Sequence, residues 1–365
     1  MRLLHEQNVE KIALGAAVLG SGGGGDPYLG KLMAIQAIKE HGPVKLIDVY
    51  ELSDNDLVFP SAAMGAPVVM LEKIPNGEEP KKAIAALENY LGKKATAIIP
   101  IEAGGLNSCI PIYTAACLGL PLVDGDGMGR AFPELMMVSY GIGGKNASPM
   151  VVCDEKGNMV ILESINNQWA ETLARSVTVA MGLFTQMSIY VMSGADVKQF
   201  AIKNTMSLAE KIGGCLVSQS DASINPVDKI IKTTNACRLF EGKVVDVRRD
   251  LATGFIRGHA KFEGIRTYTG QIFSIDFQNE NLVATRNANA VAMTPDLITL
   301  LDIEKGLPVQ TDTLKYGQRL AAIGIPCDKF WKTEEALKVT GPRYFKYDFD
   351  YIPIEELEKQ NGGIR

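Results

Sequence analysis

The chain has 365 residues, of which 46% are hydrophobic and 22% are charged. This composition is typical of globular proteins and argues against an intrinsically disordered chain. The 37 Lys and Arg residues against 42 Asp and Glu residues give a net charge of -5 without a basic stripe, so nucleic-acid binding has little electrostatic support. Because the length exceeds what one ordinary hydrophobic core supports, we expect two domains.

Helical and strand-like patterns alternate along the first half of the chain. Helices are expected at 7–18, 28–41 and 79–91, a further helix is expected from Asn107 or Ser108 to Cys117, and strands are expected at 44–49, 57–59, 68–71, 96–101 and 121–123. Residues 150–153 and 159–163 have the pattern of a hairpin. The alternation predicts an α/β domain over residues 1–165, with a parallel or mixed sheet flanked by helices.

The second half begins with helical patterns and continues with strands. Long helices are expected at 167–192 and 196–212, and Asp196 with Gln199 resembles a capping box at the start of the second one. From about residue 240, short segments rich in Val, Ile, Phe and Thr indicate strands. We expect a C-terminal domain over 166–365, with a helical segment at 166–235 and a β-rich, barrel-like part at 236–365.

The numbers of cysteines and histidines limit the kinds of site. The six cysteines are scattered without a CxxC pair, which favours reduced cytoplasmic thiols over disulfides or a structural zinc. The three histidines, His5, His41 and His259, are too few for a histidine-rich metal site. Neither a signal peptide nor an apolar run of about 18 residues is present, so we expect a cytoplasmic protein that does not bind membranes.

Three loops that follow expected strands carry the main site candidates. Ligands of open α/β sheets bind beyond the carboxyl ends of the strands, which favours the loops 61–67, 102–107 and 124–134. The loops contain Glu102, Asn107, Asp124, Asp126, Arg130 and Glu134. Clustered acids shift one another's pKa values, as general acid/base catalysis requires. They would equally suit an oxygen-preferring divalent cation such as Mg²⁺ or Mn²⁺, whereas the structural alternative is that they cap helices.

The second concentration of unusual residues is a glycine run. It consists of Gly22, Gly23, Gly24 and Gly25, followed by Asp26. Its backbone N–H groups would bind an anionic or polar substrate at the start of the next helix. No Gly-Lys-Ser/Thr follows and the G-x-G-x-x-G context is missing, so neither a P-loop nor a Rossmann fingerprint is indicated. A flexible turn is the alternative, although four consecutive glycines have a high backbone entropy cost.

Weaker candidates lie elsewhere. Cys109 near a helix N-terminus would have a lowered thiol pKa, but a buried structural thiol is the more frequent case. His259 lies in a strand-like segment and is expected to have a structural role. Asn279, Glu280 and Asp296 are polar groups at loop-like positions, and one of them is expected to face the cleft.

Seven segments resemble a known two-domain bacterial and archaeal family. They are LGSGGGGDPYLG (19–30), MGAP (64–67), EAGGLNS (102–108), GLPLVDGDGMGRAFPE (119–134), FQNENL (277–282), PDLITLLD (295–302) and GPRYF (341–345). The family, formerly one of unknown function, is named after S-methyl thiohydantoin desulfurase. Two positions depart from its pattern: Lys346 stands where glycine is expected, and Ala103 stands where a larger aliphatic residue is expected, which would widen the pocket.

The resemblance implies an α/β domain followed by a β-rich domain, and hydrolysis of a hydantoin-like ring. The substrate would be a five-membered cyclic amide, ureide or thiohydantoin. An S-methyl thiohydantoin would release methanethiol. The rival hypothesis is a non-catalytic ligand-binding or accessory subunit of a hydantoin-utilisation pathway. In either case the partner is a small molecule, and we expect a homo-oligomer.

Roles for the candidates follow from the chemistry of such a ring. Water attacks its amidine-like carbon with help from a base, Glu102 or Asp124, either directly or through a metal-bound water. Asp126 and Glu134 would be metal ligands or the acid partner, and a metal would be held first by Glu102, Asp124 and Asp126. Asn107 and Arg130 would hold the ring carbonyl or a substrate carboxylate. We expect Glu102, Asp124 and Asp126 to face one cleft with the glycine run.

Overall fold

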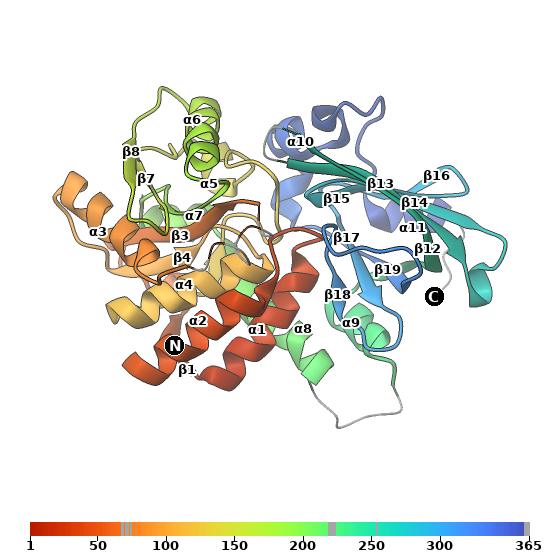
Figure 1. Cartoon of the computed structure of the whole chain (residues 1–365), viewed down its shortest axis with the longest axis horizontal. Helices are drawn as coiled ribbons and strands as arrows, with labels where there is room; N and C mark the ends of the chain where they lie inside the picture. The colour runs from red at the N-terminus through yellow and green to blue at the C-terminus, as the bar shows by residue number, and fades with distance from the viewer. Residues whose placement is uncertain (67–68, 70–72, 74, 218–223, 253–254, 361–365) are drawn as a thin grey trace.

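The computed structural model describes residues 1–66, 69, 73, 75–217, 224–252 and 255–360, and two sheets organise it. The first sheet lies in the half of the molecule formed by the N-terminal part of the chain (Figure 1). Its strands are β1 (Arg2–Leu4), β2 (Val44–Ile47), β3 (Leu57–Gly65), β4 (Ala97–Pro100), β5 (Leu122–Val123), β7 (Met150–Cys153), β8 (Met159–Leu162), β9 (Phe184–Ser188) and β10 (Met192–Ser193). Their order is β1-β2-β5-β4-β3-β9-β7-β8, and β10 pairs with β3.

This first sheet is mixed, which confirms the expected fold class. Its centre is parallel, because β2 pairs with β5, β5 with β4, and β4 with β3 in the same direction. The remaining pairs, β1 with β2 and the β3-β9-β7-β8 series, are antiparallel. The carboxyl ends of β3 and β4 therefore lie side by side, which places the loops that follow them at one edge of the sheet.

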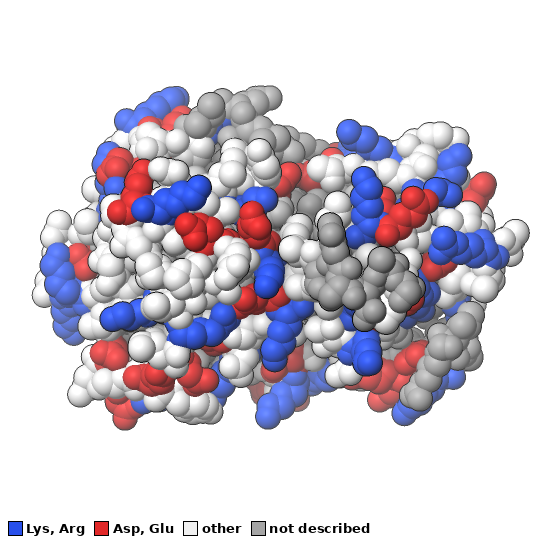
Figure 2. Space-filling model, turned by 90° about the horizontal axis from the view of Figure 1, so that it is seen from below, with Lys and Arg blue, Asp and Glu red and all other residues white. Residues whose placement is uncertain are grey.

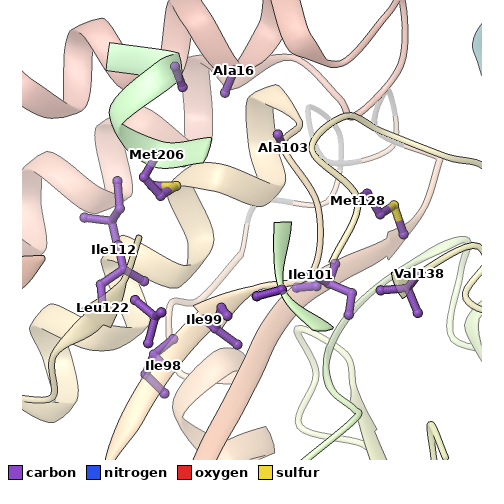
Figure 3. Packing of buried hydrophobic residues seen from close by; sticks show 14 of the residues in the cluster. Ala16, Ile98, Ile99, Ile101, Ala103, Ile112, Leu122, Met128, Val138 and Met206 are labelled. Atoms are coloured by element: carbon purple, nitrogen blue, oxygen red, sulfur yellow. The ribbon is translucent and has the colours of Figure 1, made fainter. Parts of the chain in front are cut away.

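Helices cover this sheet. They are α1 (Glu6–Leu19), α2 (Pro27–His41), α3 (Glu79–Leu91), α4 (Gly105–Leu118), α5 (Ser139–Ile142), α6 (Asn167–Ala180), α7 (Gly194–Phe200) and α8 (Thr205–Val217). The fully buried Ile98, Ile99 and Leu122 of the strands belong to one hydrophobic core with Ile112 of α4 (Figure 3). Strands that are buried on both faces have continuous runs of apolar residues. Strand β4, with the sequence AIIP at Ala97–Pro100, is buried throughout and shows such a run.

Helix α8 packs against α1 at very short distance. A Cβ atom on Gly15 would lie 1.8 Å from the carbonyl oxygen of Ala209, and one on Gly213 would lie 1.8 Å from that of Lys11. Each glycine therefore lies directly against the backbone of the other helix. This crossing fixes the position of α1, and hence of the glycine run that follows it.

The second sheet is antiparallel throughout, as expected for the β-rich part. It consists of β12 (Cys237–Ala252), β13 (Phe255–Gly264), β14 (Ile272–Gln278), β15 (Glu280–Arg286), β16 (Asn289–Met293), β17 (Leu297–Asp302), β18 (Pro308–Val309) and β19 (Arg319–Ile325), in the order β16-β15-β14-β13-β12-β19-β17-β18. The sheet curls so that β15 and β16 lie against β17, and it encloses a core that includes Phe240, Phe262 and Phe273. Helices α9 (Pro226–Thr234), α10 (Glu334–Thr340) and α11 (Ile354–Gln360) accompany this half.

Several expected elements differ in the structure. The helix expected at 167–192 ends at Ala180 as α6, because Gly182 and Leu183 have φ of 92° and 71° and form a turn that precedes β9. The helix expected at 196–212 is split into α7 and α8 by β11 (Ile202–Lys203), which pairs with β6 (Gly125–Asp126). The strand expected at 68–71 lies largely outside the described residues.

Two expected helix caps were wrong by a few residues. Ser193 is the N-cap of α7, and Asp196 is the third helical residue of its capping box. Gly104 is the N-cap of α4, so Asn107 lies within the first turn and its side chain is available for contacts elsewhere.

The two halves of the chain are closely joined. Leu297, Leu301 and Ile323 of the second sheet belong to the same hydrophobic cluster as the first sheet. Strand β9 and helix α8, both beyond residue 165, complete the first half. Where the chain divides into separately folding units stays a prediction.

The distribution of surface charge and the length of the helices are relevant to the partners expected from the sequence. On the face shown in Figure 2, Lys and Arg are interspersed with Asp and Glu. None of the helices in the described ranges is long and apolar enough to span a bilayer.

The departure at Lys346 generates a first prediction. Lys346 ends a 3₁₀ helix (Pro342–Phe345) with φ of 72°, a left-handed conformation that glycine adopts without the steric cost of a Cβ atom. Lys346→Gly should therefore raise the free energy of unfolding by up to about 1 kcal/mol in urea denaturation, after the greater entropy of glycine in the unfolded chain is subtracted. As a matched control, Lys338→Gly in the right-handed helix α10 should lower it by about 1 kcal/mol. Equal destabilisation by both changes would contradict this account.

Candidate active site

A cavity of about 100 Å³ lies between the two halves of the molecule. Its wall is formed by Gly22–Gly25, 63–65, 101–102, 106–107, 128, 132–135, Arg175, Phe184, Met187, Ile256, Asn279, Glu280 and 310–312. A volume of roughly 10–15 Å³ of this kind accommodates one water molecule, so the cavity has room for several waters or a small ring.

The glycine run lies between the two halves and contacts both. On one side, a Cβ atom on Gly24 would lie 2.6 Å from the Cα of Gly104, at the start of α4. On the other side, a Cβ atom on Gly23 would lie 2.0 Å from Oε1 of Glu280. Gly22 and Gly24 also have φ of 91° and 72°. Side chains are therefore excluded here both by space and by backbone conformation, which explains the glycines better than a flexible turn does.

Hydrogen bonds fix this run to the second sheet. The preceding Ser21 exchanges hydrogen bonds with the backbone of Ile298 through its Oγ, at 2.9 and 3.0 Å. The N–H of Asn281 donates to the carbonyl of Ser21 at 2.8 Å, and that of Thr311 donates to the carbonyl of Gly22 at 2.9 Å. On the side of the first half, the N–H of Leu106 donates to the carbonyl of Gly24 at 2.9 Å.

Glu102 contributes one carboxyl group to the cavity. It lies two residues after the end of β4 and is 7% exposed, and its Oε1 accepts a hydrogen bond of 2.6 Å from the amide of Asn107. Burial raises the pKa of Glu102 to about 7, although hydrogen bonds from Asn107 and from the backbone N–H of Phe132 oppose the shift. Its carboxyl therefore exchanges a proton readily near neutral pH.

Glu280 contributes a second carboxyl group from the other half. It is the first residue of β15, 3% exposed, and follows Asn279, whose φ of 58° makes the tight turn from β14. Burial and the neighbouring charge of Glu102 raise the pKa of Glu280 to about 8, against the influence of Arg130 and the N–H of Gly24. Its Oε2 has no hydrogen-bond partner among the residues that the structure describes. This oxygen is thus buried without a partner in the described part of the chain.

Arg130 lies behind the wall of the cavity and does not line it. It is fully buried, and its guanidinium donates to the carbonyls of Ala131, Pro295 and Asp296 at 2.5–3.0 Å. Burial lowers its pKa to about 10, and the charges of Glu280 and Glu102 act in the opposite direction. Arg130 joins the two halves through these carbonyls and lowers the pKa values of the two acids, whereas its expected contact with a substrate stays a prediction.

Asn107 is also occupied by protein contacts. Its side-chain oxygen accepts the N–H of Ala63 at 2.7 Å, and its amide nitrogen donates to the carbonyl of Ala63 at 3.1 Å as well as to Glu102. Asn107 lines the cavity, but all of these contacts tie Glu102 to strand β3. It therefore positions the Glu102 carboxyl.

Three of the expected acids lie away from the cavity wall. Asp124 accepts hydrogen bonds from the N–H of Ser207, at 3.0 Å, and from its hydroxyl, in the first turn of α8. Asp126 accepts the N–H groups of Met128 and Gly129 at 2.5 Å, and burial raises its pKa to about 7. Asp26 caps α2 through the N–H of Tyr28. The loop 124–134 bends so that only its second part reaches the cavity.

Glu134, the last residue of the loop 124–134, does line the cavity. Its Oε2 accepts the hydroxyl of Tyr344 at 2.7 Å, and burial raises its pKa. The expected cluster of four acids is therefore not formed. Among the described residues there is no group of three or more His, Cys, Asp or Glu side chains that would hold a metal ion, so the metal stays a prediction without a site here.

The weaker candidates have mainly structural surroundings. Cys109 is fully buried, and this raises its pKa to about 12. His259 pairs with Asp276 at 2.6 Å on the second sheet, outside the cavity wall. Asp296 accepts the N–H groups of Cys327 and Ile354, both at 2.8 Å. Ala103 is buried in the core of the first half and does not widen the cavity (Figure 3).

Several residues of the cavity wall have only weak signals in the sequence. Arg175 and the run Gln310, Thr311 and Asp312 were not predicted as site residues, and Glu280 was one of three polar residues of which one was expected to face the cleft. The sequence does contain a signal that favours Glu280 as a site residue. The segment FQNENL (277–282) places this acid among residues typical of strands. Arg175 lies at an ordinary position in an amphipathic helix, and no local signal distinguishes it.

The contacts of Asp124 predict a stability effect. Asp124→Ala removes two acceptors from the first turn of α8 and should lower the free energy of unfolding by about 1–2 kcal/mol in chemical denaturation. Ser207→Ala leaves the backbone N–H contact and should have a smaller effect. The double variant should be less destabilised than the sum of the two changes. An Asp124→Ala protein as stable as the parent would contradict the capping role.

Comparisons with known proteins agree with this architecture. Residues 7–164 match the S-Me-THD-like N-terminal domain model, and residues 165–354 match the S-Me-THD-like C-terminal domain model. A crystal structure of a protein from Chromobacterium violaceum has the same fold, with a TM-score of 0.80 and 22% identity over 97% of this chain and 100% of that one. No curated protein matches the chain. The two domain models span nearly the whole sequence, so the chain belongs to the S-Me-THD-like family.

Proposed function

We propose that the protein is a hydrolase of a hydantoin-like five-membered ring, with an S-methyl thiohydantoin as its substrate and methanethiol as a product. The observation that carries the proposal is the pair Glu102 and Glu280. One acid from each half lines the same small cavity, and burial raises the pKa values of both into the neutral range. Family membership supports the substrate class.

The reaction needs a base and an acid. Glu102, which has the lower pKa, removes one proton from water as its oxygen attacks the carbon between the two ring nitrogens. Glu280 donates its proton to the sulfur as the carbon–sulfur bond breaks. The remaining water proton passes to the ring nitrogen as the new carbonyl forms. Proton exchange between the two acids then restores the starting state.

The surroundings hold this pair in place. Asn107 fixes the orientation of the Glu102 carboxyl, and the buried charge of Arg130 prevents both pKa values from rising further. The N–H of Gly24 is directed at Glu280, so this donor of the glycine run stabilises the carboxylate left after proton transfer. We assign to Asp124 and Asp126 the role of shaping the loop that carries Glu134.

Replacement of either acid tests the assignment. Glu102→Gln and Glu280→Gln keep the shape but remove the titrating group, so each should lower kcat on the order of 10²–10⁴-fold. Thiol release from an S-methyl thiohydantoin by the purified protein, followed with a thiol-reactive dye, measures this. Asp124→Asn is the matched control and should stay close to the parent rate.

Two results would contradict the proposal in different ways. Purified protein that binds the ring without releasing thiol would instead be a ligand-binding or accessory subunit. Loss of activity on chelator dialysis, with recovery on adding Mg²⁺ or Mn²⁺, would replace direct attack with a metal-bound water.

The pKa values predict the pH dependence of the rate. The productive state has Glu102 ionised and Glu280 protonated, and the pair titrates as a coupled unit. Activity should rise with pH through about 7, where Glu102 loses its proton, and fall through about 8, where Glu280 loses its proton. Initial rates measured across this range in buffers of constant ionic strength would show a narrow bell. A rising limb near the ordinary carboxyl pKa of about 4.3 would contradict the assignment of Glu102 as base.

A further inference from the structure

The cavity wall carries an asymmetric charge. Arg175 of α6 is the one cationic side chain on the part of the wall that the structure describes. The carboxyl groups of Glu102, Glu134, Glu280 and Asp312 form the other charged part of this wall. Arg175 was not expected from the sequence, and the proposed reaction does not use it.

Arg175 is held rigidly by three different contacts. Its Nε donates to Glu171 one turn earlier on α6, and its Nη2 donates to the carbonyl of Pro133 at 3.2 Å. The guanidinium also lies over the ring of Phe255, from the second sheet, 4.2 Å from its centre. Glu171 is itself fixed, because its other oxygen accepts the N–H of Leu135 at 2.9 Å. A guanidinium held in this way loses little entropy when it binds a ligand.

One end of this guanidinium remains available. Its Nη1 donates no hydrogen bond to the residues that the structure describes. The side chain is 15% exposed and lies on the wall of the cavity. The planar fork of arginine matches a carboxylate, and such charge-assisted bonds are about twice as strong as neutral ones. Glu134, which follows Pro133, also lines the cavity. Its raised pKa and its hydrogen bond from the hydroxyl of Tyr344 reduce its repulsion of a bound anion.

The position of Arg175 relative to the reacting groups follows from one short segment. The N–H of Phe132 binds Glu102, and the carbonyl of the next residue, Pro133, binds Arg175. Two residues span at most roughly 7 Å even when the chain is fully extended. A five-membered ring placed at Glu102 would therefore reach Arg175 with a substituent of one or two carbons.

We propose that Arg175 selects ring substrates that carry a short acidic substituent, by pairing with its carboxylate. This inference rests on the proposed function, because it places the ring between Glu102 and Glu280. The carboxylate then points toward α6, and the susceptible ring carbon lies at the glycine run.

Isothermal titration calorimetry with hydantoin and hydantoin-5-acetic acid tests the inference. The full-length protein should bind the acid about tenfold or more tightly than the parent ring. Arg175→Gln should reduce this preference to roughly twofold or less without weakening hydantoin itself. Arg175→Lys keeps the charge and the stem, so it should retain part of the preference and guards against a folding defect in the Gln variant. Arg319→Gln, which removes an exposed arginine on β19, is the matched control and should change nothing.

The outcomes separate this inference from the function on which it rests. Equal affinity for the two rings in the parent protein, or a preference that survives in Arg175→Gln, overturns the role of Arg175 while thiol release still tests the hydrolase. A preference that depends on Arg175, in a protein that releases no thiol, supports the binding role and overturns the hydrolase. Binding of neither ring overturns the role of Arg175, and thiol release then decides separately on the hydrolase.

Discussion

The close contact of the glycine run with both halves of the molecule is the constraint on which the site depends. Gly24 meets Gly104 of the first half, and Gly23 meets Glu280 of the second, at distances that no Cβ atom would allow. Ser21 and Gly22 add hydrogen bonds to the second sheet. Because α1 is fixed by its glycine crossing with α8, the run that follows α1 sets the separation of the two halves. The cavity is the space left beside that contact.

Electrostatics then determine the properties of the cavity. Two carboxyl groups are buried near each other, and full ionisation of both would be costly in a region of low dielectric constant. Arg130 supplies one buried positive charge to the pair from behind the wall, while its hydrogen bonds go to backbone carbonyls. The arrangement therefore holds about one negative charge and about one proton near neutral pH. This is the state that an acid/base pair requires.

Arg175 shows how the same wall would combine reactivity and selectivity. The segment from Phe132 to Leu135 contacts Glu102, Arg175 and Glu171 in succession through its backbone. A single loop therefore relates the reacting carboxyl to the proposed carboxylate site. A change in the length of this loop would alter both at once, whereas replacement of Arg175 alone would alter only the choice of substrate.

The sequence by itself determined the elements whose signals are local. Apolar runs identified β4 and β7, the helical repeat and Gly92 identified α3, and the carboxylate loops pointed to Glu102, which lines the cavity. The mixed first sheet, the antiparallel second sheet and the family were recognisable on the same basis. Local patterns work here because burial on a strand or a helix face imposes a fixed spacing of apolar residues.

Only the tertiary structure decided which polar residues meet. Asp124 and Asp126 follow a strand as Glu102 does, but the loop turns their carboxyl groups to α8 and to its own backbone. Glu280 and Arg175, far from Glu102 in the chain, reach the cavity because the second sheet and α6 pack around the glycine run. Residues 184–188 and 192–193 form strands rather than helix because they pair with β3 and β7. Side-chain partners at long sequence separation depend on how the two halves dock, and no local pattern carries that information.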